Sequence, residues 1–171
     1  MVIPLKKHNV LVMALGAFAF VIVAAWLWFA ADTQRKVDPL VVKVVSLLGV
    51  GFFTVCGIYL VRKLFDTRPG LVLDREGIVD HSSGAAMGRI PWDDITNVKV
   101  SSIAGQAFVT IEVVEPGKYV ARGGALTRKL HAANVRLTGS PINISTNLLP
   151  VTLDELVQAI ALRRAQHLER R

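Results

Sequence analysis

VLVMALGAFAFVIVAAWLWFAA, residues 10–31, decides the fold class of this chain, because it contains no charged side chain. A helix over these residues would be about 33 Å long, enough to cover a hydrocarbon core about 30 Å thick. The stretch is therefore predicted to span a membrane. Trp26, Trp28 and Phe29 gather near its end, where amphipathic aromatic rings favour the membrane interface.

A second apolar run, LVVKVVSLLGVGFFTVCGIYLV at residues 40–61, carries a single charge, Lys43. A lysine near the end of a span can extend its ammonium group to the lipid headgroups. The connection between the runs, residues 32–39, allows a tight hairpin and nothing more. We therefore predict a two-helix transmembrane hairpin within residues 1–65 and a separate domain over residues 66–171.

A cleavable signal peptide is the alternative interpretation of the first run, because Lys6 and Lys7 precede it. Signal peptides usually have an apolar core of about 7–15 residues followed by a small residue at the cleavage site. This run is longer, and the bulky Trp28 and Phe29 stand where a small residue should be. The sequence favours a retained span.

The basic residues that flank the two runs predict the orientation of the hairpin, since cytoplasmic segments carry an excess of Lys and Arg. Two lie in the connection, Arg35 and Lys36. Five lie outside it, namely Lys6, Lys7, Arg62, Lys63 and Arg68. We therefore predict a multi-pass protein of a bacterial inner (plasma) membrane with both termini in the cytoplasm. The lone cysteine, Cys56, lies inside a span and offers no disulfide framework.

The net charge of +7 and the isoelectric point near 10 raise the question of a nucleic-acid partner. Residues 64–171 hold thirteen Lys or Arg against eleven Asp or Glu, so this part carries only +2. The remaining basicity flanks the two spans. No nucleic-acid partner is predicted.

After residue 67 the sequence changes to short alternating runs of the kind that form antiparallel strands. Residues 71–74 and 78–81 are predicted to form a hairpin whose turn uses Gly77 at a positive φ. The further predicted strands are 95–103, 107–114, 135–139 and 142–145. Thr152 and Glu155 form a capping-box pattern, which predicts a closing helix over about 153–168. The expected fold is a small antiparallel barrel or sandwich capped by this helix, in a membrane-anchored α+β chain.

Three pieces carry a family resemblance: LVLDREGIVDHSS (71–83), GRIPWDDITNVKV (88–100) and PINISTNLLPVTLDELVQAI (141–160). They resemble bacterial two-span membrane proteins with a pleckstrin-homology-like (PH-like) cytoplasmic domain, and the similarity covers both the spans and the domain. The resemblance implies a PH-like β-barrel closed by the C-terminal helix. It also implies that Trp92 lies in the core, at a joint that leads from one strand to the next.

The adjacent carboxylates Asp93 and Asp94 raise the question of an acid–base pair or a metal site. Neighbouring residues point to opposite faces of a strand and diverge by about 100° on a helix, so they seldom converge. Pro91 fixes its backbone, Trp92 offers a large apolar body, and an aspartate can cap a turn. We therefore interpret Pro91, Trp92 and Asp94 as a structural joint, and expect Asp94→Ala to leave the domain folded.

Enzyme chemistry has no visible signature in the sequence. The four histidines, His8, His81, His131 and His167, form no metal-binding spacing, and no nucleophile elbow or phosphate-binding glycine loop is present. No catalytic residue, metal ligand or cofactor is predicted, and the protein is predicted not to be an enzyme.

The segment from Pro116 to Arg136 is rich in basic residues and contains no Asp or Glu. Its basic residues are Lys118, Arg122, Arg128, Lys129 and Arg136. Two interpretations stay open: a loop or short helix that contacts anionic lipid headgroups or a partner, and a solvated insertion between two strands.

Together these features predict a non-enzymatic membrane protein whose PH-like cytoplasmic domain acts as a binding or scaffold module. Its ligand would be an anionic lipid headgroup, a peptide or a membrane-protein partner. The alternative function is an accessory subunit of an inner-membrane transporter or envelope complex, with the two spans as the contact surface.

Overall fold

A computed structural model of the chain describes residues 1–33 and 37–170. Arg35 and Lys36, which entered the orientation prediction, lie outside the described residues. The chain divides into two compact units, which are described one at a time. One unit is Lys7–Thr67, and the other combines Met1–Lys6 with Arg68–Arg171.

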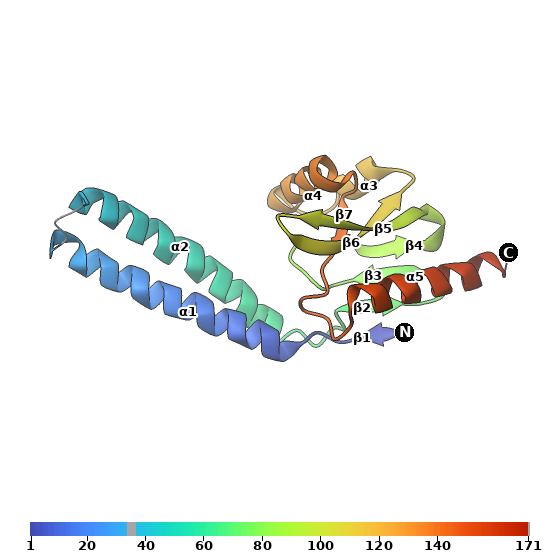
Figure 1. Cartoon of the computed structure of the whole chain (residues 1–171), viewed down its shortest axis with the longest axis horizontal. Helices are drawn as coiled ribbons and strands as arrows, with labels where there is room; N and C mark the ends of the chain where they lie inside the picture. Colours follow the sequence, from blue (N-terminus) through green and yellow to red (C-terminus); the bar gives the residue numbers. More distant parts are fainter. Residues whose placement is uncertain (34–36, 171) are drawn as a thin grey trace. The chain divides into compact units, whose positions relative to one another are not determined.

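The first unit consists of two long helices, α1 (Lys7–Ala30) and α2 (Pro39–Leu64), which lie side by side (Figure 1). A single 3₁₀ turn, η1 (Ala31–Thr33), follows α1. Asp38 caps the start of α2 by accepting a hydrogen bond from the Leu40 backbone N–H at 2.7 Å. Both helices are long and apolar enough to cross a membrane.

Contacts between small and aromatic side chains pack α1 against α2. The rings of Phe20 and Phe53 stack with their centroids 4.5 Å apart. Gly49 faces Ala24 closely enough that a Cβ at residue 49 would lie 3.4 Å from the alanine methyl group. Close approach of this kind is typical of helices that associate in lipid.

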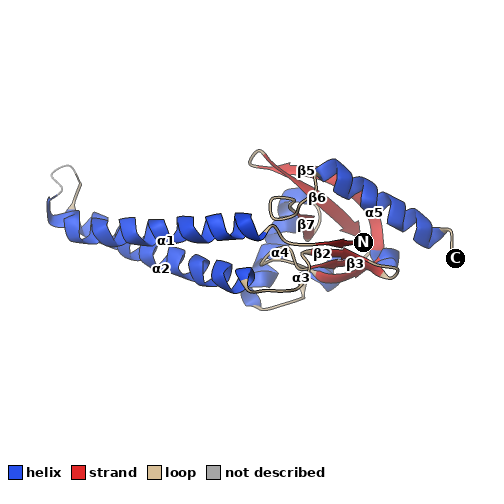
Figure 2. Cartoon of the chain, turned by 90° about the horizontal axis from the view of Figure 1, so that it is seen from below, coloured by secondary structure: helices blue, strands red, loops and turns tan. Residues whose placement is uncertain are grey.

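The second unit contains two antiparallel sheets (Figure 2). The four-stranded sheet has the order β1 (Val2–Ile3), β2 (Leu71–Leu73), β3 (Gly77–Asp80) and β4 (Gly88–Pro91). The three-stranded sheet has the order β5 (Ile95–Ile103), β6 (Gln106–Val113) and β7 (Ile142–Ile144). A 3₁₀ turn, η2 (Trp92–Asp94), leads from β4 to β5. The helices are α3 (Pro116–Val120), α4 (Ala125–Thr138) and α5 (Leu153–Leu168).

The closing helix α5 has the predicted bounds, and its predicted capping box is confirmed. The Thr152 side chain accepts from the Glu155 N–H at 3.2 Å, and the Glu155 carboxylate accepts from the Thr152 N–H at 2.8 Å. Leu156 and Ile160 point from α5 into a core shared with both sheets. The other core residues include Leu71, Leu73, Ile78, Ile90, Trp92, Val109, Ile111, Ile142, Ile144 and Leu149.

Strand β1 was not predicted, and it changes the division of the chain. Val2 pairs with Val72 and Ile3 with Leu71, so the first residues form an edge strand ahead of α1. Ile3 is buried in the core. A strand of two residues is too short to show an alternating pattern in the sequence. The predicted unit of residues 1–65 is therefore corrected, because Met1–Lys6 belongs to the sheet unit.

The predicted strand at residues 135–139 is wrong, because residues 135–138 form the last turn of α4. The alternation of Val135 and Leu137 with polar neighbours fits a strand and an amphipathic helix equally well over so short a stretch. Gly139, with φ 81°, ends the helix by donating its N–H to the Val135 carbonyl at 2.9 Å. A left-handed glycine after the last turn is a common helix end.

The predicted hairpin of β2 and β3 is confirmed, but the positive φ expected at Gly77 is wrong. The turn is made by the Asp74 side chain, which accepts hydrogen bonds from the N–H groups of Glu76 and Gly77, both at 2.9 Å. Glycine is required at residue 77 for another reason. A Cβ there would lie 2.1 Å from the carbonyl oxygen of Ile90 on β4.

Candidate functional site

The joint between the two sheets is built on Trp92. Its side chain is 2% exposed and packs in the core. The indole Nε1 donates to the Asp74 carbonyl at 3.1 Å, and the Trp92 N–H donates to the Glu76 carbonyl, also at 3.1 Å. Pro91 ends β4 immediately before it. The joint therefore ties η2 to the β2–β3 turn.

The adjacent carboxylates of η2 point to different helices. Asp93 lies 3.0 Å from Nε2 of His167 on α5. Asp94 accepts hydrogen bonds from Tyr119, at 2.5 Å, and from Lys118, at 2.8 Å, both on α3. The two aspartates thus contact α5 and α3 respectively, instead of converging on one ligand.

Tyr119 is fully buried, and its position explains the role of Asp94. Hydrogen bonds from Lys118 and Tyr119 hold the pKa of Asp94 below its usual range. Burial, reinforced by the neighbouring Asp94 carboxylate, raises the pKa of Tyr119. At neutral pH the carboxylate is therefore ionised and the phenol keeps the proton that it donates.

Arg122 closes the same cluster from the other side. Its guanidinium group lies 4.2 Å from the centroid of the Tyr119 ring, a cation–π distance. It also donates to the carbonyl oxygens of Arg89 at 2.7 Å and Met87 at 3.2 Å. Lys118 and Arg122, two of the five candidate contact residues in the basic segment, thus bind other residues of the domain.

Arg128, Lys129 and Arg136 are the other three candidate contact residues, and all lie exposed on α4. None of the three forms an ion pair with a residue that the structure describes. The structure therefore divides the five basic residues into a pair that binds other residues of the domain and an exposed group of three. We call the exposed group of three the α4 basic surface.

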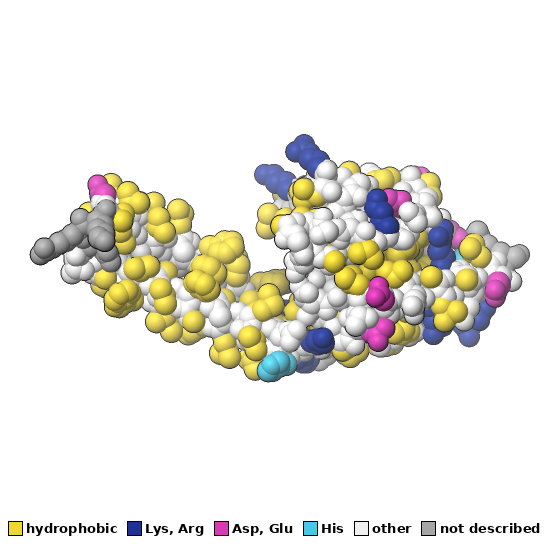
Figure 3. All heavy atoms as spheres, viewed as in Figure 1, with side chains coloured by type: hydrophobic (Ala, Val, Ile, Leu, Met, Phe, Trp, Pro, Cys, Tyr) yellow, Lys and Arg dark blue, Asp and Glu magenta, His cyan; other side chains and the backbone are white. Residues whose placement is uncertain are grey.

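The exposure of the leucines of α4 was not predicted from the sequence. Leu126, Leu130 and Leu137 are 72%, 45% and 62% exposed. Figure 3 shows Lys and Arg side chains that project from the surface over α4, with hydrophobic side chains beside them. The helical spacing of these leucines was available in the sequence, but the expectation of a strand at 135–139 obscured it.

A second group of basic residues lies around a polar cavity of about 150 Å³ beside α5. Arg75, Arg163 and Arg170 line it. Asp74 also lines it, and although burial acts to raise the pKa of this carboxyl, hydrogen bonds from Arg89 and two backbone N–H groups lower it overall. The three arginines of this cavity form a second basic group with the same number of charges as the α4 basic surface.

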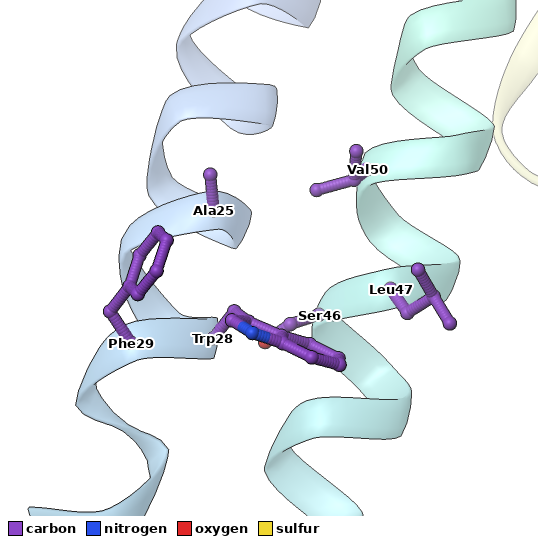
Figure 4. Close-up of a pocket in the computed structure, with 6 residues that line it drawn as sticks. All are labelled: Ala25, Trp28, Phe29, Ser46, Leu47 and Val50. Carbon is purple, nitrogen blue, oxygen red and sulfur yellow. The ribbon is translucent and has the colours of Figure 1, made fainter.

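The helical unit carries apolar hollows on its surface. One is lined by Ala25, Trp28, Phe29, Ser46, Leu47 and Val50 (Figure 4). The Ser46 hydroxyl is buried there and has no hydrogen-bond partner among the described residues. A larger hollow of about 390 Å³ is lined by residues of both helices, including Phe18, Phe53 and Gly57.

Within residues 1–33 and 37–170, no three His, Cys, Asp or Glu side chains are grouped so as to hold a metal ion. Comparison of the chain with protein-family models, curated proteins and solved structures found no match.

The structure changes the expectation for Asp94. Asp94→Ala would leave the buried Tyr119 hydroxyl without its acceptor, which should cost about 1–3 kcal/mol of unfolding free energy. Asp93→Ala removes a more exposed contact and should cost less than about 1 kcal/mol. Thermal unfolding of the full chain in detergent micelles measures both. Equal costs for the two variants would contradict the role given to the Asp94–Tyr119 contact.

The cost of Asp94→Ala should also depend on pH. Because folding lowers the pKa of Asp94, its contribution is present above the unfolded pKa of about 3.9 and is lost as the pH falls through the folded pKa. The difference between wild type and Asp94→Ala should therefore shrink in acid. In a Tyr119→Phe background, Asp94→Ala should lower the free energy of unfolding at neutral pH by less than it does in the wild type.

Proposed function

We propose that this chain is a non-enzymatic integral membrane protein of a bacterial inner membrane, whose two helices anchor a PH-like cytoplasmic binding or scaffold domain. Two observations support the architecture. Two helices are long and apolar enough to cross a membrane. The four-stranded and three-stranded antiparallel sheets, with one C-terminal helix packed on their shared core, are similar to the PH-like arrangement.

The pairing of β1 with β2 supports an even number of crossings. β1 precedes α1, whereas β2 follows α2, and the two strands are hydrogen-bonded neighbours. A pair of strands at opposite ends of the hairpin requires both ends on one side of the membrane. The basic residues that flank the helices favour the cytoplasm as that side.

The observation that carries the proposed ligand is the α4 basic surface. Arg128, Lys129 and Arg136 are exposed, and residues 116–153 contain no Asp or Glu. A basic residue near an anionic membrane surface contributes about 1 kcal/mol of attraction. The connection between α2 and β2, residues 65–70, reaches about 20 Å at most, so a membrane anchor would keep the domain near headgroups. Anionic lipid headgroups are therefore the proposed ligand.

The experiment uses the full chain with Cys56→Ala and one introduced cysteine. In intact cells, a membrane-impermeant maleimide should label Thr33→Cys and should not label His167→Cys. In lipid nanodiscs, a donor dye at Gly124→Cys reports the distance from α4 to acceptor-labelled headgroups by energy transfer. Charge reversal of Arg128, Lys129 and Arg136 to Glu should lower the transfer when phosphatidylglycerol is present.

A matched control reverses the same number of charges elsewhere in the domain, at Arg75, Arg163 and Arg170. This control should keep the energy transfer of the wild type. Salt at about 1 M, where the Debye length is about 3 Å, should lower the wild-type transfer as charge reversal does. Equal transfer in the α4 variant and the wild type would refute the headgroup ligand, and outside labelling of His167→Cys would refute the orientation.

The second candidate function, an accessory subunit of an inner-membrane transporter or envelope complex, is favoured by the hollow of about 390 Å³ on the helical unit. Apolar hollows lined by Phe18, Phe53 and Gly57 are surfaces on which another membrane helix could pack. A stoichiometric partner retained on gentle detergent extraction, and lost in Gly57→Phe, would favour this function over the first.

A further inference from the structure

Helix α4 is inverted relative to an ordinary surface helix. A surface helix usually buries its apolar side chains and exposes its polar ones. In α4 the buried residues are polar, His131 at 1% exposure and Thr138. Its three leucines, Leu126, Leu130 and Leu137, are exposed instead. They recur at intervals of four and seven residues, so they form one stripe along the helix.

Polar contacts hold α4 in this orientation. Nε2 of His131 lies 3.1 Å from the Ala85 carbonyl oxygen, outside the helix. The Asn143 side chain in turn donates to the Thr138 hydroxyl at 3.1 Å. Turning the leucines inward would break the contacts of His131 with Ala85 and of Thr138 with Asn143, in the middle and at the end of the helix. The outward stripe is therefore built into the domain.

The charges beside the stripe indicate what covers it. Lys129 and Arg136 lie together on one flank of the leucines on the helical wheel, and Arg128 lies on the opposite face of the helix. The helix has no acidic residue. A helix with leucines on one face and basic residues at its edges is typical of segments that lie in the interface of an anionic membrane.

The helix α5 of the same unit shows the contrast. It has aliphatic side chains at helical spacing too, but Leu156 and Ile160 are fully buried against the sheets. The domain can thus bury leucine and isoleucine from a helix, and does so where the helix serves the core. The leucines of α4 lie outside that core.

We propose that α4 lies in the plane of an anionic lipid bilayer, with Leu126, Leu130 and Leu137 inserted at the boundary between headgroups and acyl chains. The inference rests on the proposed function and specifies how α4 meets the membrane: Lys129 and Arg136 contact headgroup phosphates, and the leucines penetrate below them. The bilayer is the occupant because it offers both negative charge and apolar volume along one plane. The anchoring helices in the same chain keep the required partner within reach.

The test places an environment-sensitive dye on the stripe of the full chain in phosphatidylglycerol-containing nanodiscs. Dye at Leu130→Cys or Leu137→Cys, in the Cys56→Ala background, should show blue-shifted emission. It should also lose most of its fluorescence when the lipids carry nitroxide groups on the upper acyl chain. Dye at Gln158→Cys, an exposed position on α5, should show neither effect.

Dyes on α4 that behave like the dye at Gln158→Cys would overturn the inference, and would indicate that a protein partner absent from the nanodisc covers the stripe. The energy-transfer experiment separates this failure from failure of the proposed function. If energy transfer depends on the charges of α4 but nitroxides on the acyl chains do not quench the dye, the headgroup ligand stands and the insertion of the leucines is refuted. If nitroxides on the acyl chains still quench the dye after charge reversal at Arg128, Lys129 and Arg136, insertion of the leucines stands and binding through charge is refuted. A Leu130→Ser, Leu137→Ser double variant should lower the transfer and keep the domain folded.

Discussion

Gly77→Ala is expected to unfold the four-stranded sheet. The added methyl group would lie 2.1 Å from the Ile90 carbonyl oxygen and 2.8 Å from Cα of Pro91. Both atoms belong to the backbone of β4, which pairs with β3 through Ile78 and Ile90. No side-chain rotation relieves such a contact, so the strands must separate. We expect a loss of at least about 4 kcal/mol, among the largest effects of single substitutions.

Amide hydrogen exchange of the full chain in detergent micelles measures this effect, and residues 71–91 should lose protection in Gly77→Ala. The matched control is Gly117→Ala on α3, where no atom lies within 4 Å of the new methyl group. Because alanine is the better helix former, this control should be neutral or slightly stabilising. Unchanged protection in Gly77→Ala would contradict the pairing of β3 with β4.

Trp92→Ala is expected to have the second large effect. Removing a buried tryptophan leaves a cavity and typically costs about 3–5 kcal/mol. Here the Asp74 carbonyl also loses its hydrogen-bond donor. The cavity would open where η2, α5 and both sheets meet in one core, so both sheets should lose protection from exchange.

Trp92→Phe separates the two contributions, because it keeps most of the apolar volume and removes the indole N–H. It should cost less than Trp92→Ala, and its cost should localise to the β2–β3 turn that carries Asp74. Trp28→Ala, in the helical unit, should leave exchange in residues 71–113 unchanged. A Trp92→Ala variant as stable as the wild type would show that the joint is dispensable.

Local patterns in the sequence predicted many of the helices and strands of the fold. The two apolar runs predicted α1 and α2, the alternation of residues 95–103 and 107–114 predicted β5 and β6, and the capping box predicted α5. These elements are long or have a local signature. Strand β1 has neither, because its partner β2 comes only after the whole helical unit. A pairing between distant segments leaves no periodic trace in two residues.

The candidate site was harder to predict than the fold. Composition identified the basic segment but could not divide it, because the partners of Lys118 and Arg122 come from η2 and β4, elsewhere in the sequence. The buried hydroxyl from which Asp94 accepts a hydrogen bond belongs to Tyr119, 25 residues along the chain, so no local pattern links the two residues. Which face of α4 is buried is likewise determined by tertiary contacts, such as the one between His131 and Ala85.

The early position of β1 has a consequence for biosynthesis. At about 5–20 residues per second, the roughly 70 residues between β1 and β2 take on the order of 3–14 s to be translated. During this interval β1 has no partner, and in the proposed orientation it can meet β2 only after both helices have inserted. A chain with one helix inserted would hold the two strands on opposite faces of the membrane. In the proposed orientation the sheet can thus be completed only in chains whose two helices have both crossed the membrane.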